Sequence, residues 1–150
     1  MTRASGFRCQ LSIINCPLSV HYQLSIIHLG PPMKDGALQV KSFAFAVRIV
    51  NMYRHLTERR KEFVLSKQAL RSGTSIGANV EEAIGGQSRA DFISKLNVAY
   101  KEARETSYWI RLLQETNYLD QAEATSLLSA AEELLRIVGS ILKTSKPTNS

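Results

Sequence analysis

The sequence predicts an all-α protein, an antiparallel up-down-up-down four-helix bundle that occupies residues 33–145. Apolar residues recur every three or four positions in four successive segments, which is the pattern of amphipathic helices. Short turns separate the segments, and short connections favour antiparallel neighbours. The sequence contains no GxGxxG, Walker or CxxC motif, so it does not indicate a nucleotide-binding or zinc-binding fold.

Residues 1–32 differ from the rest of the chain, and three interpretations stay open for them. The segment QLSII occurs at 10–14 and again at 23–27. Two arginines before an apolar stretch suggest a secretory signal, but polar residues and a proline interrupt that stretch. Alternating Leu and Ile residues fit a β-hairpin. We favour a non-native or disordered extension translated from an early start site, with Met33 as the true start.

The first two helices are expected at 39–59 and 63–85. The apolar line of the first consists of Ala46, Ile49, Tyr53 and Leu56, widened by Phe43, Val47 and Val50. The line of the second consists of Leu65, Ala69, Ile76, Val80 and Ala83. Gly73 and Gly77 inside the second helix cost about 1 kcal/mol each relative to Ala. We therefore expect another helix to approach closely there, because small side chains permit it.

The third and fourth helices are expected at 88–118 and 120–144, followed by a disordered tail at 146–150. Ser88 with Asp91 and Asp120 with Glu123 form the expected N-terminal caps. The seam of the third helix has coiled-coil-like spacing and consists of Phe92, Leu96, Ala99, Ala103, Thr106, Ile110 and Leu113. The line of the fourth consists of Leu127, Ala131, Leu134, Val138 and Ile141.

Basic charge is concentrated in the first half of the bundle. The chain carries a formal net charge of +6, and the segment from Lys34 to Arg71 has nine Lys or Arg against three Asp or Glu residues. A basic surface attracts phosphate groups, although most charge runs form only a solvated face. The candidate nucleic-acid-binding residues are Arg48, Arg54, Arg59, Arg60, Lys61, Lys67 and Arg71.

A polar signature lies on one face of the second helix, formed by Ser72, Ser75, Asn79 and Glu82. We interpret it as a hydrogen-bonding network between helices, with Glu82 meeting a Lys or Arg of the third helix, because buried polar groups are normally paired. A ligand site is the alternative. On the third helix, Glu102, Glu105 and Arg111 fit ordinary helix charge pairs. Trp109 fits a packing anchor, with stacking on a base as the alternative.

Arg48 and His55 form an R-x6-H spacing that suggests a ribonuclease, in which His acts in acid–base catalysis. The motif lacks its usual context, so we expect no catalytic residues, no metal site and no cofactor. The two cysteines, Cys9 and Cys16, lie before the bundle, and a reducing, cytoplasmic location fits. No apolar run is long enough to cross a membrane.

Three pieces of the sequence carry a family resemblance that spans about Val40 to Leu142. They are RSGTSIGANVEE at 71–82, SRADF at 88–92, and KEARET with YWIRLL between 101 and 113. The chain resembles the four-helix-bundle family first recognised in intervening sequences of bacterial 23S ribosomal RNA genes.

That family is similar in fold to the accessory variability determinant protein of diversity-generating retroelements. The resemblance implies a homo-oligomer, specifically a homopentamer, that contacts structured RNA. A reverse transcriptase or a ribosomal component is the implied protein partner. The alternatives are a ribonuclease that uses Arg48 and His55, or a protein–protein scaffold in which the oligomer itself is the function.

Overall fold

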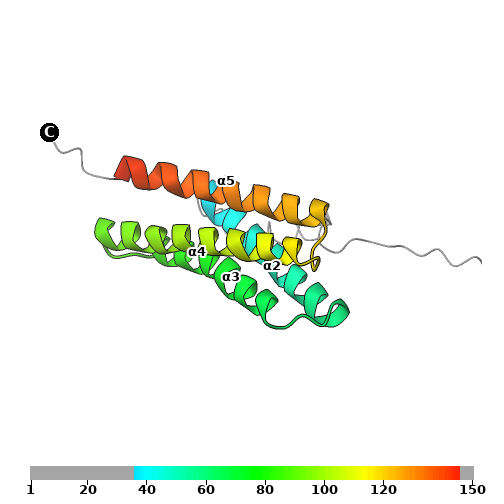
Figure 1. The fold of residues 1–150 in the computed structure, drawn as a ribbon. Coiled ribbons are helices and arrows are strands. Elements are labelled where there is room, and N and C mark those ends of the chain that lie inside the picture. Colours follow the sequence, from blue (N-terminus) through cyan, green and yellow to red (C-terminus); the bar gives the residue numbers. More distant parts are fainter. Residues whose placement is uncertain (1–35, 146–150) are drawn as a thin grey trace, which may run out of the picture.

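The computed structural model describes residues 36–145, and the predictions for residues 1–32 and 146–150 lie outside them. The described chain forms four helices, α2 (Ala37–Arg59), α3 (Leu65–Ile84), α4 (Arg89–Glu115) and α5 (Gln121–Ser145), which follow one another through short turns (Figure 1). The all-α fold class predicted from the sequence is confirmed.

The helices pack in the cyclic order of an up-down-up-down bundle. α3 lies against α2 and α4, and α5 lies against α4 and α2. In Figure 1, α4 and α5 run side by side, and the turns after α2 and after α4 lie at the same end of the bundle. α2 contacts α5 less extensively than the other neighbouring pairs contact each other. Part of α2 therefore stays open to solvent.

The core follows the predicted seams of α3, α4 and α5, but on α2 only Ile49 and Leu56 of the predicted line are buried. Phe45, Ile49, Met52 and Leu56 are buried on α2, whereas Phe43 and Val50 are 53% and 38% exposed. α2 carries apolar residues around much of its circumference, so spacing alone did not decide which stripe faces inward. The buried line has 4-3-4 spacing and starts at Phe45, whereas the predicted line had 3-4-3 spacing and started at Ala46.

Two helix boundaries differ from the predicted ones for local reasons. α3 begins at Leu65 and not at 63, because the Glu62 carboxylate accepts from the N–H groups of Leu65 and Ser66 and so caps the helix there. α4 ends at Glu115 and not at 118, because Asn117 adopts a left-handed φ of 60°. The caps were predicted correctly. Ser88 Oγ accepts from the N–H of Asp91 at 3.1 Å.

The close helix approach predicted at the glycines of α3 is confirmed at Gly73. A Cβ atom placed on Gly73 would lie 2.8 Å from Cγ1 and 2.9 Å from Cγ2 of Ile49 on α2. At Gly77 the nearest atom would be the carbonyl oxygen of Ser42, at an ordinary contact distance of 3.5 Å. α2 therefore crosses α3 most tightly over Gly73.

None of the helices in the described part of the chain has the length and apolar character needed to cross a membrane.

Candidate nucleic-acid interface

The candidate interface is the turn between α2 and α3 with the basic side chains on either side of it. At the end of α2, the backbone N–H groups of Arg60 and Glu62 both donate to the carbonyl oxygen of Leu56, at 3.1 Å. Between them, Lys61 adopts a left-handed φ of 54°, which is uncommon for a residue with a side chain. Backbone hydrogen bonds thus fix the first half of this turn.

Glu62 fixes the second half, because its carboxylate caps α3. Oε1 accepts from the N–H groups of Val64 and Leu65 at 2.9 and 2.8 Å, and Oε2 accepts from that of Ser66 at 2.7 Å. Glu62 lies between the helices predicted at 39–59 and 63–85, and its side chain is buried. Burial raises the pKa of the Glu62 carboxyl, and the hydrogen bonds from Ser66, Leu65 and Val64 outweigh it, so the pKa lies below its ordinary value.

The basic residues around this turn face solvent. Six of the seven predicted binding residues are exposed, namely Arg54, Arg59, Arg60, Lys61, Lys67 and Arg71. Glu62 is the only acidic residue between positions 59 and 71, and its carboxylate faces the backbone of α3. From Arg59 to Arg71 the outward side therefore presents cations without an outward carboxylate, and the exposed Glu58 lies just before this range on α2.

Arg48, the seventh predicted residue, lies between helices and is half-buried. Its guanidinium donates to Oγ of Ser126 at 2.8 Å and to the Ser126 carbonyl oxygen at 3.4 Å. Burial lowers the pKa of Arg48 from its ordinary value. The side chain thus joins α2 to α5. His55, one heptad along α2, is also half-buried, and the described hydrogen bonds do not link it to Arg48.

Two apolar side chains at the tip of the turn were missed by the sequence interpretation, which placed them inside the second helix. Phe63 is 55% exposed and Val64 is 70% exposed. A signal was present in the sequence. An acidic residue shortly before an apolar run, here Glu62, is typical of a helix N-terminus. It indicates that the residues directly after it belong to the turn.

Three members of the polar signature on α3 bond to other residues of the protein, Ser72 and Glu82 across to α4 and Asn79 within α3. The hydroxyl groups of Ser72 and Thr106 are buried and hydrogen-bond each other, with 2.9 Å between their oxygens. Asn79 Nδ2 donates to the carbonyl oxygen of Ser75 at 2.8 Å. Glu82 forms an ion pair with Lys95 of α4, as predicted for a basic residue of the third helix.

Among the predicted charged and aromatic residues of α4, Trp109, Glu105 and Arg111 form hydrogen bonds along their own helix. Trp109 packs against the core and its Nε1 donates to Oε1 of Glu105 at 3.1 Å. Arg111 Nε donates to the carbonyl oxygen of Ser107 at 3.3 Å. Burial and the neighbouring Glu105 raise the pKa of Glu102, although the Arg71 guanidinium opposes this shift. Trp109 therefore serves as a packing anchor here.

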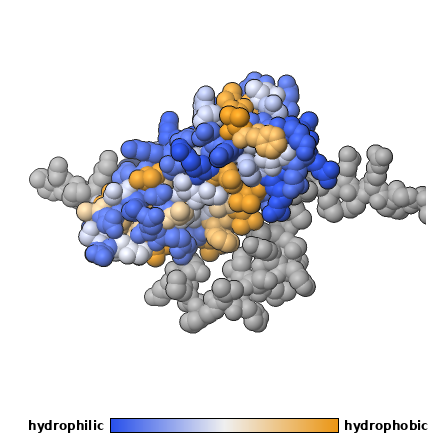
Figure 2. Space-filling model, turned by 90° about the horizontal axis from the view of Figure 1, so that it is seen from below, coloured by the Kyte–Doolittle hydropathy of each residue, from blue (hydrophilic) through white to orange (hydrophobic). Residues whose placement is uncertain are grey.

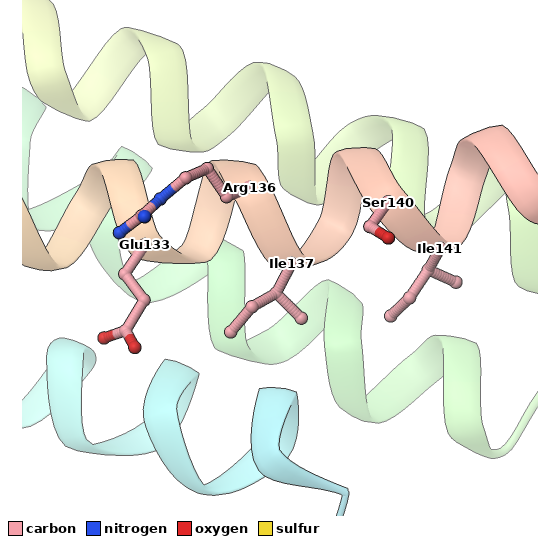
Figure 3. A pocket seen from close by; sticks show the side chains of 5 residues that line it. All are labelled: Glu133, Arg136, Ile137, Ser140 and Ile141. Atoms are coloured by element: carbon pink, nitrogen blue, oxygen red, sulfur yellow. The ribbon is translucent and has the colours of Figure 1, made fainter.

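Within residues 36–145, the structure contains no cluster of three or more metal-ligating side chains. In the same range every buried side-chain nitrogen or oxygen has a hydrogen-bond partner. One cavity of about 420 Å³ lies along α5 (Figure 3), lined by Glu133, Arg136, Ile137, Ser140 and Ile141. All five residues come from one helix, so the cavity does not gather side chains from several elements as ligand sites do.

The fold and these side chains define a class of protein, a small four-helix bundle with a satisfied polar signature and an exposed basic turn. Residues 34–140 match the family described as 23S rRNA-intervening sequence protein, and the chain belongs to that family. The resemblance drawn from the signature residues is thereby confirmed. Similarity to the retroelement accessory protein stays a prediction.

A solved structure supports the same assignment. The chain is similar to a protein of unknown function from the S23 ribosomal protein family of Bacteroides thetaiotaomicron, seen in a crystal structure. The two are 53% identical with a TM-score of 0.71, and the match covers 71% of this chain and 99% of that one. None of the curated proteins compared with this chain matches it.

Proposed function

We propose that this protein is a non-enzymatic, cytoplasmic, oligomeric RNA-binding bundle whose turn between α2 and α3 contacts the phosphates of structured RNA. The observation that carries the proposal is the arrangement of charge at this turn. Arg59, Arg60 and Lys61 are exposed, while Glu62 turns its carboxylate onto the backbone of α3. Phosphate contacts by Arg and Lys release counterions from RNA, and this release supplies most of the affinity of sequence-independent binding.

The proposed self-association is supported by α2. Val40, Phe43 and Val50 are 51%, 53% and 38% exposed, and with Val47 they follow the spacing of one helix face. On the surface shown in Figure 2, apolar residues gather in patches between broad hydrophilic areas. A second copy that covered the α2 stripe would bury these side chains. It would also add a second basic turn to the same assembly. The number of five copies, and a reverse transcriptase or ribosomal component as partner, rest on the resemblance alone.

Binding of a structured RNA at two salt concentrations tests the RNA proposal. The triple variant Arg59→Gln, Arg60→Gln and Lys61→Gln should bind about ten-fold more weakly or worse at low salt, with a shallower salt dependence. A matched control removes the same charge elsewhere through Lys101→Gln, Arg104→Gln and Lys143→Gln, all at exposed positions. Equal losses in both variants would show that net charge matters and that this turn does not.

Light scattering tests the oligomer. Phe43→Asp places a charge in the centre of the exposed stripe on α2 and should shift the protein to smaller species, because burying an unpaired charge is costly. Tyr108→Asp on α4 is the control, since Tyr108 is 51% exposed and Phe43 is 53% exposed. A monomeric wild-type protein would contradict the proposed assembly.

A further inference from the structure

We infer that the tip of the turn between α2 and α3 binds unpaired nucleotides, with Phe63 stacking on a base while the surrounding cations hold the phosphates. This inference rests on the proposed RNA binding and narrows it to a substrate class, RNA that offers a loop, bulge or single-stranded end.

Phe63 is presented outward by a turn that is fixed on both sides. Before it, the N–H of Glu62 donates to the carbonyl oxygen of Leu56 at 3.1 Å. After it, the N–H groups of Val64 and Leu65 are held by the Glu62 carboxylate. Phe63 is nevertheless 55% exposed. A ring held by a fixed backbone loses little conformational freedom on binding, which favours affinity.

The positive charges around the Phe63 ring favour a negatively charged partner. Arg59, Arg60, Lys61 and Lys67 all lie within four residues of Phe63 in the sequence and are exposed. A second copy of the same tip would bring like charges together, so self-association through this tip is disfavoured. A polyanion is favoured, and one exposed aromatic ring among cations is the arrangement that proteins use to bind single-stranded nucleic acid.

The geometry also favours unpaired over paired nucleotides. In a continuous duplex, each base face is covered by its neighbours, so an aromatic side chain finds no free face to stack on. A loop or single-stranded end exposes these faces, while its phosphates stay available to the cations. Duplex RNA would therefore use only the cations, and unpaired RNA would use both the cations and Phe63.

Fluorescence anisotropy with two RNAs tests the inference, one a hairpin with an unpaired loop and the other the same stem extended as a continuous duplex. Phe63→Ala should weaken hairpin binding about ten-fold, the scale of one base–aromatic stack, and leave duplex binding within about two-fold. The salt dependence should not change, because no phosphate contact is removed. Phe63→Tyr should bind like the wild type, and Phe63→Leu should bind like Phe63→Ala.

Tyr108→Ala is the matched control, because it removes an exposed aromatic side chain from α4, and it should leave both RNAs unaffected. An equal effect of Phe63→Ala on hairpin and duplex, or full binding by Phe63→Leu, would overturn the stacking role and leave the proposed RNA binding intact. A wild-type protein that binds neither RNA would overturn both. Binding to anionic phospholipid vesicles in place of RNA would identify the tip as a membrane contact and would also overturn the inference.

Discussion

The turn between α2 and α3 and the middle of α3 both combine polar residues with unusual backbone features, yet they use them in opposite ways. In the middle of α3, the hydroxyl of Ser72 pairs with Thr106 of α4, and Gly73 lets Ile49 of α2 approach. At the turn, Glu62 bonds to the backbone beside it and Phe63 points to solvent. In the middle of α3 the buried hydroxyl of Ser72 therefore joins two helices, whereas the cations around the turn face solvent.

Residue type alone is therefore a poor guide to which side chains of this bundle another molecule can reach. Ser, Thr, Asn and Glu look like members of an active site, but within residues 36–145 each buried one already has its hydrogen-bond partner. A satisfied network leaves no group directed at a ligand. Lys, Arg and Phe at a turn look ordinary, but their side chains are the ones that another molecule can reach. The two regions should therefore respond to mutation in separate assays.

The largest expected effect on stability belongs to Gly73→Ala. The new Cβ would lie 2.8 Å from a buried Ile49 atom, and Ile49 is branched and cannot turn away without moving α2. Overpacking of this kind costs about 1–3 kcal/mol, which exceeds the helix propensity gained by Ala. Chemical denaturation should show a loss of about 2 kcal/mol in the free energy of unfolding, with RNA affinity unchanged at temperatures where the variant is folded.

Gly77→Ala is the natural control for that prediction, because both glycines lie in α3 one turn apart. The nearest atom to the added Cβ is the Ser42 carbonyl oxygen, at an ordinary contact distance of 3.5 Å, so the change should be neutral or stabilising by up to about 1 kcal/mol. Equal destabilisation by both substitutions would show that the helix tolerates no side chain at either site and that contact with Ile49 is not the cause.

Glu62→Gln should have an intermediate effect, with a pH dependence that identifies its cause. The amide keeps one acceptor but turns an N–H₂ group towards the N–H groups at the start of α3, so about 1 kcal/mol of stability should be lost at neutral pH. The pKa of Glu62 lies below its ordinary value of 4.5 in the folded protein. Its contribution is therefore complete above that value and disappears as pH falls through the folded pKa.

Denaturation curves of wild type and Glu62→Gln should accordingly converge in acid and separate towards neutral pH. A constant difference across the pH range would mean that the carboxylate charge is not what stabilises the turn. Because the cap also holds Phe63, Glu62→Gln should weaken binding of the hairpin RNA more than binding of the continuous duplex. Variants in the middle of α3 should leave the binding of both RNAs unchanged.

Much of this fold could be predicted because periodicity and caps are local properties of the sequence. The seam of α4 from Leu96 to Leu113 was placed correctly, and so was the cap at Ser88. On α2 the prediction failed for Phe43 and Phe45, since both fit a helical stripe. Which of them faces inward depends on how α2 is rotated about its own axis, and contacts between distant segments, such as that of Ile49 with Gly73, fix this rotation.

The candidate site was less predictable than the fold. The basic residues were visible from composition, but Arg48 was grouped with them although it reaches Ser126, 78 positions away in the sequence. Phe63 was counted as helical because the cap by Glu62 was not recognised. Charge can be counted along a chain, whereas exposure follows from the packing of several helices and from how each turn begins and ends.

The smallest expected effect comes from Thr106→Val, which keeps the branched shape and removes the buried hydroxyl. The variant lacks the hydroxyl that contacts Ser72 Oγ and the Glu102 carbonyl oxygen. The Ser72 hydroxyl still donates to the carbonyl oxygen of Gln68 at 3.1 Å. No buried donor is stranded, so the loss should be about 0.5 kcal/mol. Ser72→Ala should lower the free energy of unfolding less in the Thr106→Val background than in the wild type, because both substitutions remove the same hydrogen bond. Strict additivity of the two would show that the hydroxyls do not act as a pair, and a drop in RNA affinity would place this signature in the binding site after all.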